Sequence, residues 1–152
     1  MLKTVDELSP QDVSECRTRA LNLLARREHS ERELYLKLIA RDFAEEVILQ
    51  VIQQLVAKNF LSDLRFAELY VQQRARKGYG PLRIQQELQQ RGVQVELIEQ
   101  TLAAYHSEWV GNAQQAWQKY MRLHPQAEFT KQQKFLLYRG FSFEQIRAAI
   151  KN

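Results

Sequence analysis

The stretch RARKGYGPLRIQQELQQRG, residues 74–92, contains in one place the features that decide the fold. A basic run ends one predicted helix, a Gly-Tyr-Gly-Pro turn follows, and a short helix continues to Gly92. Pro81 suits the first position of that helix, because its ring fixes φ and an N–H there would have no partner. Gly92 suits the position just past the helix end, which is often left-handed. The stretch therefore predicts two helices joined by a tight turn.

The features of this stretch recur along the chain. Arg41, Arg91 and Arg139 lie 50 and 48 residues apart, and each is followed by a turn residue and then an apolar residue. Apolar positions shift with the same offsets, as Leu38 does onto Leu88. A period of this length is typical of helical repeats, in which each unit has too little surface to bury alone and stacks on its neighbours. We predict an all-α fold of three tandem three-helix repeats, helix-turn-helix-like units that form an elongated, curved body.

Helix-start signals divide the chain into a tail and three repeats. Ser9-Pro10 predicts the first start, because the serine hydroxyl accepts a bond from the first turn and proline fits beside it. Ser62-Asp63 and Ser107 predict the starts of the fourth and seventh helices. The predicted segments are an N-terminal tail (1–8) and three-helix repeats 1 (9–61), 2 (62–106) and 3 (107–152).

Shorter patterns make finer predictions. Ser30-Glu31-Arg32-Glu33 and Ser142-Phe143-Glu144-Gln145 are typical of capping boxes, in which side chain and backbone bond reciprocally. Thr130 is predicted to cap the eighth helix. The fourth helix is predicted to bury Phe66, Leu69, Tyr70 and Gln73.

The turns differ between the copies. Asn59 is predicted to end the third helix in a left-handed conformation. Asp42 stands where the second and third copies have glycine. Because aspartate adopts the left-handed region only at some cost, the first turn is expected to be strained or differently shaped.

Composition and charge restrict the class of protein. Cys16 is the single cysteine, so no internal disulfide is possible, and a reducing cytoplasm is expected. No apolar run approaches the roughly 18–20 residues that span a bilayer, and the first residues lack a secretory apolar segment.

Charge is distributed unevenly along the chain. Residues 1–63 have 9 Lys and Arg against 11 Asp and Glu, and residues 64–152 have 13 against 7, which together give the net +4. The basic half favours nucleic acid, an acidic protein surface or an ordinary solvated surface.

Motifs for catalysis or for a cofactor do not stand out. His29, His106 and His124 are scattered without a Cys neighbour at metal-ligand spacing. The Gly78-Tyr79-Gly80-Pro81 turn lacks the preceding strand and the Lys-Ser/Thr of a phosphate-binding P-loop. Cys16 lies on an apolar helical stripe, where a small buried hydrophobe is expected. We predict that the protein is not an enzyme and has no cofactor or metal.

The basic residues are the candidate functional group. Arg74, Arg76 and Lys77 lie at a helix C-terminus, where the helix dipole by itself favours cations. That effect does not explain Arg83, whose nearest acidic residue on the helix is Glu87 at i+4. A second cluster lies in the last repeat: Lys119, Arg122, Lys131, Lys134 and Arg139. The predicted contact residues are Arg74, Arg76, Lys77, Arg83, Lys131, Lys134 and Arg139.

Aromatic residues and one helix pair leave alternatives open. Tyr79, Tyr120 and Tyr138 lie between the basic residues, where they can either stack on bases or fill the core. The helices predicted at 81–91 and 95–105 resemble a helix-turn-helix pair. The second of these contains Glu96 and Glu99 and no base-reading Arg or Asn, so major-groove recognition is weakly indicated.

Three segments are similar to a known family. HSERELYLKL (29–38), SDLRFAELYVQQRARKGYGPLRIQQELQQRGV (62–93) and KFLLYRGFSFEQI (134–146) resemble the RecX family of bacterial recombination regulators. The likeness extends from about Ser14 to the end of the chain, and its most specific part is the Arg74-x-x-Lys77-Gly78-x-Gly80-Pro81 pattern. The chain departs from the family pattern at Asp42, where glycine is usual, and in a short N-terminal extension.

The resemblance implies a function that composition does not show. Such proteins bind RecA, the recombinase that coats single-stranded DNA, in the groove of its filament. They inhibit filament extension, ATP hydrolysis, strand exchange and co-protease activity, in DNA repair and the SOS response. The expected partners are the RecA filament and single-stranded DNA, directly or through RecA, with no membrane, for a cytoplasmic monomer. The alternatives are a stand-alone single-stranded nucleic-acid-binding protein and a helical adaptor that is independent of RecA.

Overall fold

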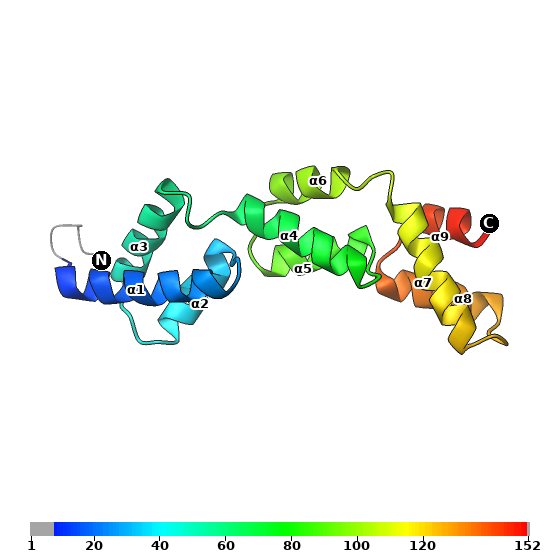
Figure 1. Cartoon of the computed structure of the whole chain (residues 1–152), viewed down its shortest axis with the longest axis horizontal. Helices are drawn as coiled ribbons and strands as arrows, with labels where there is room; N and C mark the ends of the chain where they lie inside the picture. The colour runs from blue at the N-terminus through cyan, green and yellow to red at the C-terminus, as the bar shows by residue number, and fades with distance from the viewer. Residues whose placement is uncertain (1–7, 152) are drawn as a thin grey trace. The chain divides into compact units, whose positions relative to one another are not determined.

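The described part of the chain is entirely helical. The computed structural model describes residues 8–151, so the predicted tail lies outside the described residues except for Leu8. Within this range there are nine helices and no strand, which confirms the all-α prediction of three-helix units (Figure 1). The helices are α1 Pro10–Arg26, α2 Glu31–Ile39, α3 Glu45–Ala57, α4 Asp63–Arg76, α5 Pro81–Gln90, α6 Val95–Ala103, α7 Trp109–Leu123, α8 Phe129–Arg139 and α9 Phe143–Lys151.

The described residues form two compact units. Residues up to Phe66, together with Arg91–Val93, make up the first unit. Ala67–Gln90 and the residues from Gln94 onward make up the second. The predicted repeat boundaries at 61/62 and 106/107 are a separate division of the chain and stay predictions.

In the first unit, α1, α2 and α3 enclose one apolar core. The buried side chains follow the helical spacing that the sequence shows, with Cys16, Leu34 and Ile48 fully enclosed. The predicted cap is present, because the Asp12 N–H donates to Ser9 Oγ at 3.3 Å. The predicted capping box at Ser30 is also present, with both of its hydrogen bonds to Glu33 at 3.1 Å. The local signals for α1 and α2 are therefore confirmed.

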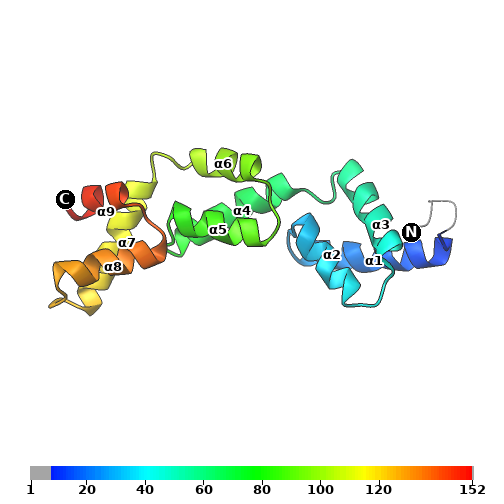
Figure 2. The ribbon, with the colours of Figure 1, turned by 180° about the vertical axis from the view of Figure 1, so that it is seen from behind.

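In the second unit, α7 packs against both α8 and α9. The neighbouring positions of α7 and α9 are visible from both sides (Figures 1 and 2). The predicted capping box at the start of α9 is confirmed, since Gln145 N–H donates to Ser142 Oγ and Ser142 N–H donates to Gln145 Oε1. Phe141 and Leu136 are fully buried beside it.

Two predicted helix starts are wrong. The helix expected from Ser107 begins at Trp109, because the Glu108 N–H is still bonded to the Tyr105 carbonyl in the preceding turn. The helix expected to be capped by Thr130 begins at Phe129, one residue earlier. Neither start has a side-chain cap bond.

The predicted buried face of α4 is also partly wrong. Leu69 is 37% exposed, Tyr70 is only partly buried and Gln73 is exposed. The buried positions are Phe66, Ala67, Val71 and Ala75. Three of these are spaced at i, i+4 and i+8, but two are alanines, and small side chains contribute little to the apolar pattern of a sequence.

The predicted left-handed turns are confirmed. Asn59 has φ 63° and Asp42 has φ 67°, and they are the non-glycine residues with positive φ in the described part. Asp42 therefore carries the backbone strain that its replacement of glycine predicts, since the left-handed region is costly for a residue with a Cβ.

In each unit, the residue before a short helix donates a hydrogen bond to the arginine carbonyl of a recurring Arg-Gly pair, which we call the Arg-Gly step. In the first unit, Ser30 Oγ donates to the Arg91 carbonyl at 2.7 Å. In the second unit, the Gly80 N–H donates to the Arg139 carbonyl at 2.8 Å. Ser30 and Gly80 occupy equivalent places, 50 residues apart. The step therefore joins one helix to another, in addition to turning the chain.

Where Gly80 meets the Arg139-Gly140 step, neither glycine has room for a side chain. A Cβ on Gly80 would lie 2.5 Å from the Gly140 carbonyl carbon. Gly140 has φ 103°, and a Cβ there would overlap Arg83. Both residues are glycine because two backbones meet at van der Waals distance.

This contact predicts a stability difference between two glycine substitutions. Gly80→Ala should lower the free energy of unfolding by about 1–3 kcal/mol, the usual cost of overpacking, because it presses on backbone. Gly111→Ala should raise it by about 0.5–1 kcal/mol, because nothing lies within 4 Å of that helical position. Urea denaturation followed by circular dichroism measures both, and equal stability of the two variants would contradict the close contact.

Candidate functional site

Three predicted contact residues converge on the ring of Tyr79. The guanidinium carbons of Arg74, Arg83 and Arg139 lie 3.9, 4.6 and 4.7 Å from its centroid. These distances are within the range of cation–π attraction. The turn at residues 78–80 places Tyr79 between α4 and α5, while Arg139 comes from the end of α8. We call Tyr79 and these arginines the arginine stack.

Glu87 supplies the negative charge of the arginine stack. Its carboxylate accepts two bonds from Arg74, at 2.9 and 2.8 Å, and lies 3.5 Å from Arg83 Nε. The Tyr70 hydroxyl donates to it at 3.1 Å. Burial alone raises the pKa of Glu87, but the hydrogen bonds from Arg74 and Tyr70 and the two positive charges outweigh burial, so the pKa lies below its usual value. Glu87 is therefore ionised at neutral pH.

The arginine stack also fastens α8 to α5 and to the end of α4. Arg83 donates to the Tyr138 carbonyl at 3.2 Å, and Arg139 donates to the Lys77 carbonyl at 3.4 Å. Arg83, which the helix dipole does not explain, is thus accounted for by Glu87 and Tyr138. Arg74, Arg83 and Arg139 hold the second unit together, and their contact with a partner stays a prediction.

The other predicted contact residues are exposed. Arg76 and Lys77 lie at the end of α4, and Lys131 and Lys134 lie on α8. Tyr138 is 71% exposed and follows the two lysines at helical spacing. Lys131, Lys134 and Tyr138 therefore share one face of α8, which we call the α8 stripe.

The three tyrosines separate into different environments. Tyr79 is covered by the arginine stack, and Tyr120 stacks on Phe135 with ring centroids 4.4 Å apart. Tyr138 is the most exposed of the three, although the Arg83 guanidinium carbon lies 4.9 Å from its ring centroid. The alternative of core or base stacking is thus decided in favour of packing for Tyr79 and Tyr120.

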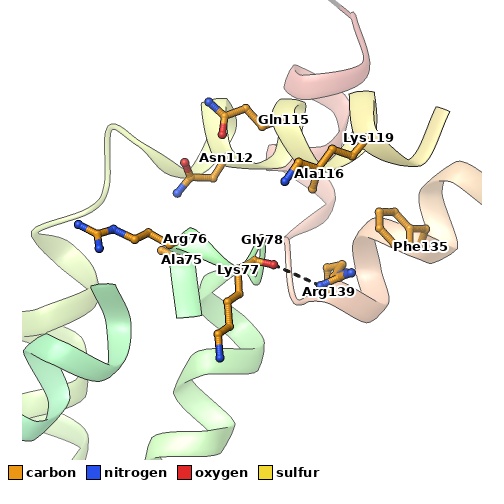
Figure 3. A pocket seen from close by; sticks show the side chains of 10 residues that line it. All are labelled: Ala75, Arg76, Lys77, Gly78, Asn112, Gln115, Ala116, Lys119, Phe135 and Arg139. Atoms are coloured by element: carbon orange, nitrogen blue, oxygen red, sulfur yellow. Dashed lines mark hydrogen bonds between the residues drawn. The ribbon is translucent and has the colours of Figure 1, made fainter. Parts of the chain in front are cut away.

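A small pocket lies beside the arginine stack. Its volume is about 80 Å³, and it is lined from three helices (Figure 3). The lining residues are Ala75, Arg76, Lys77, Gly78, Asn112, Gln115, Ala116, Lys119, Phe135 and Arg139. Four of them are Lys or Arg and none is Asp or Glu, so we call it the cationic pocket.

The contribution of α7 to this pocket is absent from the predicted contact residues. Asn112, Gln115 and Lys119 are spaced at i, i+3 and i+7, the spacing of one helical face. This spacing of polar residues is the sequence signal that could have indicated a functional face on α7. The approach of this face to Arg76 and Arg139 depends on tertiary packing, which the spacing alone does not predict.

The described residues contain no cluster of His, Cys, Asp and Glu that could hold a metal ion. His29 is buried, with Nδ1 3.0 Å from the Arg27 carbonyl and Nε2 2.9 Å from Lys37 Nζ. Burial raises the pKa of Cys16 to about 11, against the opposing charge of Arg17, so this buried thiol is protonated at neutral pH. No described helix has the length and apolar character to cross a membrane.

The fold and the site define a helical-repeat protein with a cationic surface. The sequence patterns of the first, second and third three-helix domains of RecX match residues 16–55, 62–102 and 110–150. The chain belongs to the RecX family.

Relatives and solved structures agree with this assignment. The chain is 38% identical over 135 residues to regulatory protein RecX of Legionella pneumophila (strain Corby), covering 87% of this chain and 90% of that protein. It is 41% identical over 143 residues to regulatory protein RecX of Vibrio cholerae serotype O1 (strain M66-2), covering 92% and 94%. The crystal structure of RecX from Lactobacillus salivarius superimposes with a TM-score of 0.82 at 25% identity, covering 94% and 97%. The family assignment gives this chain a RecX regulatory role.

The lowered pKa of Glu87 predicts how stability depends on pH. Its interactions stabilise the fold fully above the usual value of 4.5 and are lost as pH falls through the lower folded-state value. Glu87→Gln should lower the free energy of unfolding by about 1–2 kcal/mol at neutral pH, since charged hydrogen bonds are lost at a partly exposed position. The difference from the unsubstituted protein should shrink near pH ~3.

Urea denaturation at both pH values measures this difference. Glu68→Gln, at an exposed position on α4, is the matched control and should change stability little at either pH. A penalty of the same size at neutral and acid pH would show that Glu87 acts by its shape and not by its charge.

Proposed function

We propose that the protein is a negative regulator of the RecA recombinase. It binds the groove of the RecA filament on single-stranded DNA and inhibits filament extension, and with it ATP hydrolysis, strand exchange and co-protease activity. This role belongs to DNA repair and the SOS response, and the protein acts as a cytoplasmic monomer without catalysis of its own. The observation that carries the proposal is the match of all three RecX domains along one chain.

The proposed contact surface is the exposed cationic part of the second unit. Arg76, Lys77, Lys131 and Lys134 are exposed, and they meet acidic filament surface or the DNA within it. Such charges raise the rate of encounter and select partners of opposite sign. Arg74 and Arg83 lie beneath this surface in the arginine stack and fix its shape through their bonds to Glu87.

A second candidate function is binding to single-stranded nucleic acid without RecA. The α8 stripe favours it, because lysines beside an exposed aromatic side chain suit phosphates and stacked bases. Salt titration separates the two functions. If four or five cations contact the strand, log K falls with log salt at a slope of roughly −3. Affinity for naked DNA that persists near physiological salt supports the second function. Loss of that affinity near physiological salt supports binding to the RecA filament.

The direct test is RecA ATPase activity on single-stranded DNA with substoichiometric protein added. Inhibition well below one inhibitor per RecA is expected, because a blocked filament end affects many protomers. Inhibition that requires one inhibitor per RecA would point to sequestration, and no inhibition would contradict the proposed function.

The contact surface has its own test in charge reversal. The triple variant Arg76→Glu, Lys77→Glu, Lys134→Glu should weaken inhibition while keeping the helical circular dichroism spectrum. Arg74 is left unchanged because its reversal would break the bonds to Glu87 and confound binding with folding. The matched control Arg19→Glu, Arg41→Glu, Lys58→Glu changes three exposed cations of the first unit and should retain inhibition. Full inhibition by the folded first variant would refute this surface.

A further inference from the structure

The cationic pocket contains positive charge without a counter-ion. Among the described residues, neither Arg76 nor Lys119 forms an ion pair, and Arg139 contacts only the Lys77 carbonyl and aromatic rings. The Lys77 side chain points away from α7, so its backbone and not its ammonium group lines the pocket (Figure 3). Of the three remaining cations, Arg76 of α4 extends outward, away from Lys119 of α7 and Arg139 of α8 (Figure 3). Lys119 and Arg139 give the pocket a positive electrostatic potential.

The space between these cations is created by small residues. Ala75, Gly78 and Ala116 form part of the wall, and even an added Cβ on Gly78 would lie 4.0 Å from the Ala116 Cβ. The resulting volume of about 80 Å³ is that of two or three water molecules at ~30 Å³ each. A group of phosphate size fits this space, whereas a nucleobase with its sugar does not.

The polar groups that line the pocket are mainly hydrogen-bond donors. Arg76, Lys119 and Arg139 donate only, and the amides of Asn112 and Gln115 each offer an NH₂ group. The main-chain carbonyl of Lys77 is already occupied by Arg139. An anion with several acceptor oxygens matches such a set of donors, and charge-assisted bonds to it are among the stronger hydrogen bonds.

We infer that the cationic pocket binds one phosphate group of a single-stranded nucleic-acid backbone. Lys119, Arg139 and Asn112 hold the phosphate, and Arg76 lies at the outer edge of the pocket. This inference deepens the proposed function and rests on it for the origin of the strand, the DNA inside the RecA filament.

The α8 stripe favours nucleic acid over an acidic protein segment. Tyr138 directly precedes Arg139 in α8, and although the Arg83 guanidinium carbon lies 4.9 Å from its ring centroid, the side chain is 71% exposed. A base can therefore stack on its exposed side, beside the phosphate that Arg139 holds. Lys131 and Lys134 continue the positive charge along the same helix. Binding sites for single strands combine hydrogen-bond donors to phosphate with aromatic side chains that stack on bases. An acidic protein segment would bring carboxylates but no base to stack on Tyr138.

The test measures binding of the full chain to a short oligothymidylate at low salt, with backbone amide signals recorded by NMR. The signals of Gly78, Gln115 and Ala116 should shift. Inorganic phosphate should shift the same signals at much higher concentration, and an oligothymidylate with a neutral methylphosphonate backbone should not shift them. Oligoglutamate represents an acidic protein partner and should bind more weakly than the oligothymidylate.

Two pairs of variants assign the contact to the pocket. Asn112→Glu should weaken oligothymidylate binding by about tenfold or more, since a charged hydrogen bond is replaced by repulsion. Gln118→Glu places the same charge at an exposed position of α7 and should have a clearly smaller effect.

The second pair of variants measures the salt dependence of binding. Lys119→Gln should reduce the salt slope of log K by about 0.7, the contribution of one phosphate contact to a single strand. Lys58→Gln, an exposed cation of the first unit, should leave the slope unchanged.

Several results would overturn the inference. Equal losses for Asn112→Glu and Gln118→Glu, or an unchanged slope for Lys119→Gln, would show that the pocket is not a phosphate contact. Shifts caused by the neutral backbone would place a base there. Tighter binding of oligoglutamate would assign the pocket to protein, and tighter binding of inorganic phosphate would assign it to a free anion.

The ATPase assay keeps this inference separate from the proposed function. If Asn112→Glu binds oligothymidylate normally and the unsubstituted protein inhibits RecA, the pocket inference is wrong and the proposed function stands. If the pocket variants lose oligothymidylate binding but the unsubstituted protein does not inhibit RecA, the phosphate contact stands and the proposed function is wrong.

Discussion

The second unit depends on the place where the backbone of Gly80 meets the backbone of Gly140. The Gly80 and Leu82 N–H groups donate to the carbonyls of Arg139 and Gly140 at 2.8 and 2.9 Å. These bonds satisfy donors at the start of α5 that would otherwise have no partner inside the helix. They also fix where α8 ends, and so they set the positions of Tyr138 and Arg139. The arginine stack and the cationic pocket both follow from this contact.

The cations of the second unit have two different physical roles. Arg74 and Arg83 bind Glu87, and with Arg139 they cover the ring of Tyr79. Planar guanidinium groups suit this stacked and bidentate arrangement better than lysines do. The lysines stay exposed on α8 and at the end of α4. Arginine here organises the surface, and lysine supplies much of its accessible charge.

The sequence predicted those parts of the fold that depend on neighbouring residues. Serine caps, capping boxes and left-handed turns are local, and Ser9, Ser30 and Asn59 behave as expected. Prediction was wrong where the signal was weak, as for the alanines that form much of the buried face of α4. It was incomplete where distant helices meet. No spacing in the sequence brings Asn112 near Arg76, so the pocket needed the packing of α7 against the rest of the unit.

Asp42 sets the first copy of the Arg-Gly step apart from the other two. It occupies the place of Gly92 and Gly140, and a Cβ on Gly92 would lie 2.8 Å from the Arg32 side chain that this step receives. At Arg41-Asp42, the first copy of the Arg-Gly step, the Cβ and carboxylate of Asp42 occupy the space through which a helix start approaches the other two copies. The first Arg-Asp pair therefore differs in shape from the two Arg-Gly pairs, although its backbone has the same left-handed conformation.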